Sequence, residues 1–169
     1  WAIFAAPLMM SNDLAVVSST SRALLTNREC LRINQDPLAL QGRRVVYNGF
    51  PYPQPSLQVW ARDLQNGDVA VALYNFNHEP ASIKLNFTEV GFSGVTAVRL
   101  LDVFGNGKVS TATVHVGSWM SPTIGANETV LLRVSLADKI TIESTWRTGA
   151  GSSGVRMVQC TQPTVDCGP

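Results

Sequence analysis

The pattern of hydrophobic and polar positions changes near residue 41, and the two sides of that point predict different structures. Residues 2–10 form a continuous apolar run, which is typical of a strand that is buried on both faces. Between Ser18 and Ile33 the apolar positions recur at helical spacing, after hydroxyl side chains that can cap a helix. One strand and one helix cannot bury both of their faces alone, so residues 1–40 are predicted to belong to a larger α/β fold.

Residues 41–137 show short apolar–polar alternation interrupted by turn residues, which predicts antiparallel strands. The alternation is clearest in 69–76, where Val and Leu alternate with Ala and Tyr. Asn66-Gly67 favours a type I′ hairpin turn, and Gly105-Asn106-Gly107 indicates a second hairpin. The pattern therefore predicts an antiparallel β-sandwich of the Greek-key type. Its expected strands are 43–47, 57–62, 69–76, 82–87, 95–104, 109–116 and 129–136.

The last part of the chain, 138–169, follows a third pattern. Residues 140–146 are compatible with one more strand, and the run TGAGSSG is typical of a flexible linker. Cys160 and Cys167 are close in sequence and are candidates for a disulfide in an oxidising compartment. As an alternative, this tail is the beginning of another domain. Cys30 lies in the helical pattern and is expected to be a buried free thiol.

Composition supports a folded core and excludes several classes of partner. The chain is 45% hydrophobic and 15% charged with a net charge of +1, and no basic stripe indicates a nucleic-acid partner. The apolar run at the start is shorter than the ~20 residues that span a bilayer, so no membrane partner is expected. Three scattered cysteines and two histidines do not have the spacing of metal ligands, so no metal site is expected.

Two sequons, Asn86-Phe87-Thr88 and Asn127-Glu128-Thr129, make Asn86 and Asn127 candidate N-glycosylation sites. The Asn, Ser and Thr content alone predicts about as many sequons by chance, so their presence is compatible with secretion and is not evidence for it. His78 and His115 are expected to be packed or solvent-facing, because neither has a candidate nucleophile nearby in the sequence.

Two motifs resemble the family-27 glycoside hydrolases, the alpha-galactosidase (melibiase) family. WAIFAAPLMMSNDL, at residues 1–14, resembles the final strand of the family's (β/α)₈ barrel, and INQDPLALQGRRV, at 33–45, resembles the stretch that leads to its C-terminal domain. VWARDL and GDVAVALYNF resemble the first hairpin of the family's sandwich. Ala15 and Ala39 stand where the family usually has Arg and Gly, which indicates a divergent member.

The resemblance implies a mostly β chain: the last strand–helix unit of a catalytic barrel at 1–40, then an antiparallel β-sandwich at 41–137. We expect the chain to be a fragment of a longer enzyme, with the remainder of the barrel as its partner. A homodimer is kept as an alternative. The implied route is the secretory pathway, ending outside the cell or in a lysosome or vacuole.

The implied activity is that of a retaining alpha-galactosidase, which hydrolyses terminal alpha-D-galactosyl residues of oligosaccharides or glycoconjugates without a cofactor. Such enzymes use two carboxyl groups ~5 Å apart, on the ends of barrel strands. In the family both come from strands that precede Trp1 in this numbering, so the chain is predicted to contain no catalytic residue and to be inactive alone. Its expected role is to close the barrel and to brace it.

Four residues follow the apolar run and are candidates for the rim of the substrate site: Met10, Ser11, Asn12 and Asp13. The alternative is ordinary turn chemistry, in which the polar side chains bond to local backbone. Asp36 has two similar interpretations, as a hydrogen-bond acceptor at the domain junction or as part of an Asp-Pro pair that only ends the helix.

Two other functions remain open on the sequence. One is a sister specificity, alpha-N-acetylgalactosaminidase or beta-L-arabinopyranosidase, because the residues that select the sugar lie upstream. The other is a non-catalytic carbohydrate-binding sandwich, in which Phe50, Tyr52 and Trp60 stack on sugar rings. Coplanar and exposed rings would favour the second interpretation, whereas a packed Trp60 would argue against it.

Overall fold

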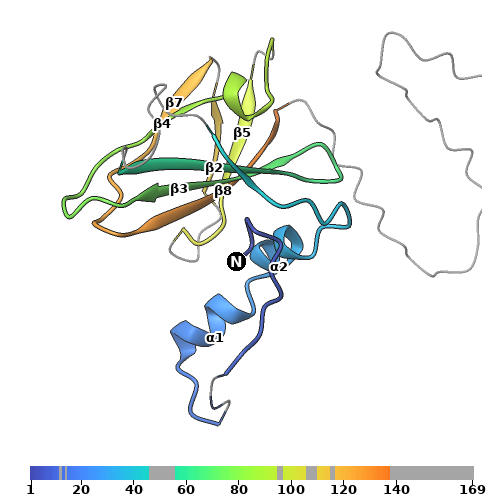
Figure 1. The fold of residues 1–169 in the computed structure, drawn as a ribbon, viewed down its shortest axis with the longest axis vertical. Helices are drawn as coiled ribbons and strands as arrows, with labels where there is room; N and C mark the ends of the chain where they lie inside the picture. Colours follow the sequence, from blue (N-terminus) through green and yellow to red (C-terminus); the bar gives the residue numbers. More distant parts are fainter. Residues whose placement is uncertain are drawn as a thin grey trace, which may run out of the picture. The chain divides into compact units, whose positions relative to one another are not determined.

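A six-stranded antiparallel sheet forms the centre of the fold (Figure 1). The computed structural model describes residues 1–11, 13, 15–45, 56–94, 97–105, 110–114 and 117–137. In sheet order the strands are β1 (Arg43–Arg44), β2 (Leu57–Asp63), β3 (Val69–Asn75), β8 (Thr129–Leu136), β5 (Val98–Asp102) and β6 (Ser110–Val114). A second sheet pairs β4 (Lys84–Asn86) with β7 (Ser118–Met120). The mostly β fold and the C-terminal sandwich are therefore as the sequence predicts.

The turn between β2 and β3 differs in type from the expected one. The amide of Gly67 donates to the carbonyl of Leu64 at 2.9 Å, and the amide of Leu64 donates to the carbonyl of Asp68 at 2.9 Å. Gly67 has φ +77°, whereas Asn66 is not at positive φ. A type I′ turn needs positive φ at both central residues, so this connection is a longer loop with a single left-handed glycine.

The helical segment is divided in two. Helix α1 covers Ser19–Leu25 and α2 covers Arg28–Asn34. Each helix has a side-chain cap: Ser18 Oγ accepts from the Ser21 amide at 3.0 Å, and Asn27 Oδ1 accepts from the Cys30 amide at 2.9 Å. The second cap begins a new helix where the sequence pattern predicts a continuous one. A short 3₁₀ helix, η1 (Thr88–Val90), ends at Gly91 with φ +99°.

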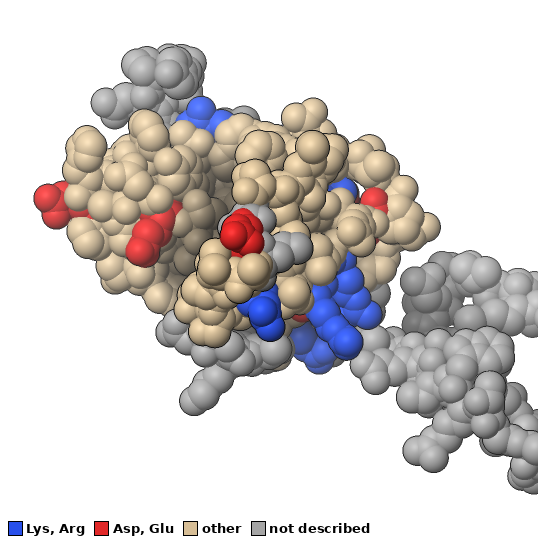
Figure 2. Space-filling model, turned by 90° about the horizontal axis from the view of Figure 1, so that it is seen from below, with Lys and Arg blue, Asp and Glu red and all other residues tan. Residues whose placement is uncertain are grey.

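The apolar run at 2–10 is not a strand, contrary to the sequence-based expectation. The amide of Ala6 donates to the carbonyl of Trp1 at 3.2 Å, and Ala5 has φ +52°, so the run begins as a turn. A buried parallel strand needs a paired strand on each side, and the part of the chain described here offers none to this segment. Met9 is 91% exposed and Met10 is 53% exposed. Viewed from the side of the helices, most of the surface is uncharged (Figure 2).

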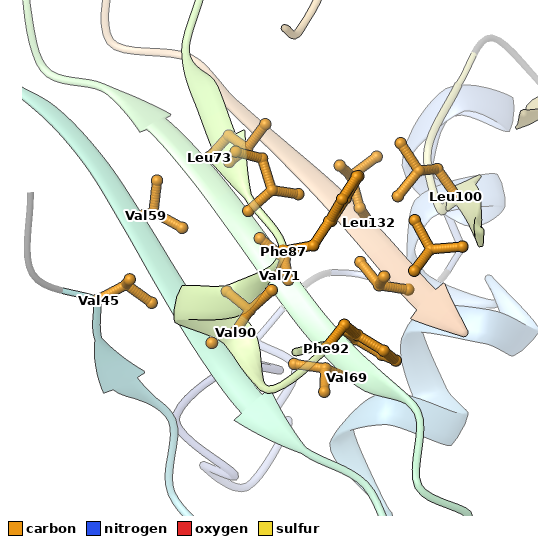
Figure 3. Close-up of a cluster of buried hydrophobic side chains, with 14 of the residues drawn as sticks. Val45, Val59, Val69, Val71, Leu73, Phe87, Val90, Phe92, Leu100 and Leu132 are labelled. Carbon is orange, nitrogen blue, oxygen red and sulfur yellow. The ribbon is translucent and has the colours of Figure 1, made fainter. Parts of the chain in front are cut away.

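The two faces of β3 are both covered, which is unusual for a strand of an antiparallel sheet. Val69, Val71 and Leu73 face the sandwich core, whose members in the six-stranded sheet and in the β4 and η1 region pack together (Figure 3). Ala70 and Ala72 face a second apolar cluster that includes Ile3 and Ile33 of the N-terminal segment. The strand is therefore the common wall of two cores.

Candidate functional site

The contact between residues 1–42 and the outer face of the six-stranded sheet, here called the junction, contains several polar contacts between residues that are distant in sequence. Its apolar part is the second cluster: Ala2, Ile3, Ile33, Leu64, Ala70, Ala72, Val103 and Leu131, with Cys30 and Trp60 packed against it. Ala70 and Ala72 of β3 share this cluster with Ile33 of α2. The alternation of large and small apolar residues in β3 therefore gives the strand one face of Val and Leu and one face of Ala.

Arg62, in β2, connects the sheet to the end of α2. The residue is 1% exposed, and its Nη1 donates to the carbonyls of Ala2 and Ile33 at 2.6 Å each. Nη1 and Nη2 also reach the carbonyl of Asn34, at 3.3 Å and 3.4 Å. The last carbonyls of a helix have no partner within it and carry partial negative charge. Arg62 therefore caps α2 from outside the helix.

The charge state of Arg62 follows from its surroundings. Burial lowers the pKa of its guanidinium, and the nearby Asp36 carboxylate opposes that shift. Arginine stays protonated in proteins, so the residue enters the junction as a cation. Its Nε has no hydrogen-bond partner among the described residues. A single buried arginine in an otherwise alternating strand, on the same face as Trp60, was the only sequence signal for this role, and it was missed.

Asp36 joins the same end of α2 to the β2–β3 turn. Both of its carboxylate oxygens accept from the amide of Gln65 at 3.1 Å, and Oδ1 also accepts from the amide of Leu38 at 3.1 Å. The Leu38 contact is the local turn chemistry expected of Asp-Pro. The Gln65 contacts cross the junction, so the purely local interpretation of Asp36 is incomplete.

The other end of α2 is fixed by a separate set of contacts. Arg133 Nη1, in β8, lies 2.8 Å from Glu29 Oε2, and Asn27 Nδ2 donates to the carbonyl of Val103 at 2.8 Å. In the strand ladders Arg62 pairs with Ala70, and Ala70 pairs with Arg133. Two arginines in one row across the sheet thus contact opposite ends of α2, with a small residue between them.

The end of α2 and the loop that follows it are also bonded to the N-terminal segment. Asn34 Nδ2 donates to the carbonyl of Ala6 at 2.8 Å, and the amide of Gly42 donates to the carbonyl of Ile3 at 2.8 Å. A Cβ atom at Gly42 would lie 2.7 Å from that same carbonyl oxygen, so only glycine fits there. The segment is therefore bonded both to the last residue of α2 and to the loop that follows the helix.

Among the described residues, Met10, Ser11 and Asp13 make no side-chain hydrogen bond to a distant part of the sequence. Met10, Ser11 and Asp13 are exposed, and Asn12 lies outside the described residues. Asp13 Oδ1 accepts from the amide of Ala15 at 2.9 Å, which is the local turn contact. In the described ranges no group of three or more His, Cys, Asp or Glu could bind a metal ion. Their place at a substrate rim stays a prediction.

Of the three aromatic candidates for a sugar-stacking platform, the structure describes only Trp60. Trp60 is half-buried, its ring meets that of Phe4 at 5.2 Å and 71°, and its Nε1 donates to Gln58 Oε1 at 3.0 Å. Phe50 and Tyr52 lie outside the part of the chain that the structure describes. Trp60 lines an apolar cavity of about 590 Å³, the junction hollow, together with Trp1, Phe4, Tyr74 and Phe104. Packing against the N-terminal segment is therefore the role that Trp60 has.

The remaining candidates are placed as follows. Cys30 is a free, half-buried thiol, and burial raises its pKa. His78 is exposed in a turn, and His115, Cys160 and Cys167 lie outside the described residues. Asn86 is half-buried in β4, and Asn127 is exposed with φ +57°. No helix in the described ranges is long and apolar enough to cross a membrane.

Two family models match the chain on either side of the junction. Residues 1–36 match the model described as alpha galactosidase A, and residues 54–134 match the model described as the alpha galactosidase C-terminal beta sandwich domain. The junction therefore contains the contacts between two segments that different models recognise.

Curated relatives and solved structures of similar proteins agree with the two family models. Alpha-galactosidase 3 of Arabidopsis thaliana is 33% identical over 113 residues, which are 67% of this chain and 25% of the relative. Alpha-N-acetylgalactosaminidase of Gallus gallus is 34% identical over 110 residues, or 64% of this chain and 26% of the relative. The structure of a GH27 beta-L-arabinopyranosidase from Geobacillus stearothermophilus has the same fold, with a TM-score of 0.68 at 22% identity, covering 82% of this chain and 28% of that one.

The chain spans about a quarter of the length of these curated relatives. The alpha galactosidase A match precedes the C-terminal beta sandwich match along the chain, and the motifs at 1–14 and 33–45 fall in and next to the first. The chain therefore belongs to the alpha-galactosidase (melibiase) family, glycoside hydrolase family 27, and corresponds to the C-terminal portion of its members.

Proposed function

We propose that this chain is the C-terminal part of a retaining alpha-galactosidase that hydrolyses terminal alpha-D-galactosyl residues. Residues 1–40 would be the last strand–helix unit of the (β/α)₈ barrel, and 41–137 the sandwich that braces it. The observation that carries the proposal is the capping of α2 by Arg62. That helix lies in the segment that matches alpha galactosidase A, and the arginine lies in the segment that matches the sandwich.

The exposed apolar surface of the N-terminal segment supports a missing partner. Trp1 is 81% exposed and Val16 78% exposed, and Phe4, Leu8, Met9, Met10 and Leu24 are also exposed. Isolated exposed apolar residues are ordinary, but a group on one segment indicates a surface that another protein surface covers. The remainder of the barrel fits this surface, because the motif at 2–10 would regain its expected strand partners there.

The proposed chemistry places no catalytic residue in this chain. Retention of configuration needs a nucleophile and an acid/base carboxyl ~5 Å apart, and both would come from earlier barrel strands. Met10, Ser11, Asn12 and Asp13 would contribute only to the rim of the site. The curated relative from Gallus gallus is an alpha-N-acetylgalactosaminidase, so that sister specificity, and beta-L-arabinopyranosidase activity likewise, stay as alternatives for the parent enzyme.

Several further properties belong to the same proposal. The parent enzyme would pass through the secretory pathway to the extracellular space, lysosome or vacuole. There Cys160 and Cys167 would form a disulfide, and Asn86 and Asn127 would be acceptors for N-glycans. A homodimer is compatible with the proposal but not required by it.

The test is to express the chain with and without its upstream coding region. The longer protein should hydrolyse an aryl alpha-D-galactopyranoside, with the α-anomer as first product by NMR, and the 169-residue chain should not. Parallel assays with the aryl alpha-N-acetylgalactosaminide and the aryl beta-L-arabinopyranoside identify a sister specificity. Turnover by the 169-residue chain alone would overturn the proposal, as would a longer protein that hydrolyses none of the three.

A further inference from the structure

A second cavity lies on the core side of the sheet and shares Phe104 and Thr129 with the junction hollow. It has a volume of about 430 Å³ and is lined by residues of β5, β7 and β8 and of the loops beside them; we call it the β5–β7–β8 hollow. The polar side chains in its lining include Asp102, Glu128, Thr123 and Thr129. Cavities of about 300–1,000 Å³ are the usual size for small-molecule sites.

Both carboxylates of this hollow are fixed by backbone contacts. Asp102 Oδ1 accepts from the amide of Phe104 at 3.1 Å, and Glu128 Oε2 accepts from the amide of Gly125 at 3.0 Å. Each acid also lies against a glycine: a Cβ at Gly105 would be 2.9 Å from Asp102 Oδ2, and one at Gly125 would be 2.6 Å from Glu128 Cδ. Each carboxylate therefore has a set position and, within the described residues, one oxygen left without a protein donor.

The rest of the lining restricts the chemistry of the ligand. Trp119 is half-buried in β7 and packs against the sandwich core, so its ring offers an apolar surface of fixed orientation. Thr123 and Thr129 add exposed hydroxyl groups. No Lys, Arg or His is among the residues that line the hollow in the described ranges, so an anionic ligand would meet two carboxylates without compensation.

We propose that the β5–β7–β8 hollow is a carbohydrate-binding site of the sandwich itself, separate from the active site of the parent enzyme. A neutral hexopyranose presents vicinal hydroxyls, which suit the free carboxylate oxygens, and an apolar C–H face, which suits Trp119. The residues differ from the aromatic platform expected from the sequence, because Trp60 is used in the junction. The proposal does not depend on the specificity of the parent enzyme.

Binding is measured by saturation-transfer NMR, using the 169-residue chain and methyl alpha-D-galactopyranoside. A single sugar ring in a partly open site should bind with a Kd on the order of 1 mM. Glu128→Gln keeps an acceptor for the Gly125 amide but removes the charge, and should raise Kd about tenfold, as for a lost hydrogen bond to a charged group. Trp119→Phe should also weaken binding. Gly125→Ala should weaken binding too, although Glu128 itself is unchanged, because the added methyl group displaces the Glu128 carboxylate.

Matched controls separate this site from other surfaces. Glu89→Gln removes an exposed carboxylate on η1, and Trp60→Phe replaces an aromatic ring of the junction hollow with a smaller one. Both variants should bind the sugar with an unchanged Kd. Circular dichroism of each variant establishes that it is folded. The proposal is overturned if no transfer to the sugar is seen, if Glu128→Gln and Gly125→Ala have no effect, or if Trp60→Phe abolishes the transfer. Binding of tetramethylammonium in place of the sugar would instead identify a cation site.

Discussion

Arg62 Nη1 lies 2.6 Å from the carbonyl oxygen of Ile33, so a strand of the sandwich supplies the cap that the C-terminus of α2 lacks. The same nitrogen contacts the carbonyl of Ala2, which lies 31 residues earlier in the chain than Ile33 by their numbers. One buried cation thus connects three segments that are distant in sequence. Its removal would leave several buried carbonyls without donors, and each such group costs free energy.

Replacing Arg62 with Met should lower the free energy of unfolding by about 3 kcal/mol, because it removes the charge and every donor to Ala2, Ile33 and Asn34. Arg62→Lys should recover only part of the loss, since an ammonium cannot reproduce the fork geometry of a guanidinium. Urea denaturation measures the free energy of unfolding of both variants. Arg99→Met is the control, because Arg99 is exposed and has one 3.3 Å contact with Ala137; its effect should stay within about 0.5 kcal/mol. Equal losses for Arg62→Met and Arg99→Met would contradict the capping role.

Replacing Asp36 with Ala should increase hydrogen exchange at the Gln65 amide and lower stability by about 1–2 kcal/mol, the range of a lost side-chain cap. The reason is that both carboxylate oxygens accept from that amide. Site-resolved exchange by NMR makes the measurement. Asp13→Ala, which removes only a local contact with Ala15, should leave the Gln65 rate unchanged. An unchanged Gln65 rate in the Asp36 variant would restore the purely local interpretation.

Enlarging Ala70 to Leu should destabilise the protein by about 1–3 kcal/mol through overpacking. Ala70 is fully buried between Arg62 and Arg133, under α2. Calorimetry would report the loss. The matched change Ala23→Leu, on the exposed surface of α1, should have an effect near zero, because both residues favour helix. If Ala70→Leu were neutral, α2 would not pack closely on β3.

Alkylation of Cys30 by iodoacetamide should require a higher pH than that of an ordinary cysteine, because burial raises the pKa of this thiol. The measurement is the rate as a function of pH in a Cys160→Ser, Cys167→Ser background. In denaturant the thiol pKa obtained from this rate profile should return to that of an ordinary cysteine. By linkage, the protonated thiol favours the folded state below the ordinary pKa, and this contribution is lost as the pH rises through the folded pKa. Identical profiles with and without denaturant would show that Cys30 is not protected.

The sequence predicted the sandwich because most of its strands show local alternation between turns, although β7 (Ser118–Met120) was not among the expected strands. Val69, Val71 and Leu73 indicated one face of β3 directly. The run at 2–10 is not a strand in the structure, because a buried strand depends on partner strands that the described residues do not offer it. The two-helix break at Asn27 was missed, since its cap competes with an otherwise continuous helical pattern. The roles of Arg62 and of the carboxylates of the β5–β7–β8 hollow were not recognised from the sequence, because their partners are backbone groups that only the fold brings near.

The double burial of β3 has a consequence for how the chain tolerates cleavage. A cut near residue 40 would follow the boundary suggested by the motifs, yet it would uncover Ala70, Ala72 and Leu131 and leave Arg62 without its carbonyl partners. The sandwich released in this way would carry an unprotected apolar wall and a buried cation newly in contact with water. Limited proteolysis at that point should therefore yield a fragment that aggregates. The part of the protein that folds as one unit is the sandwich together with α2.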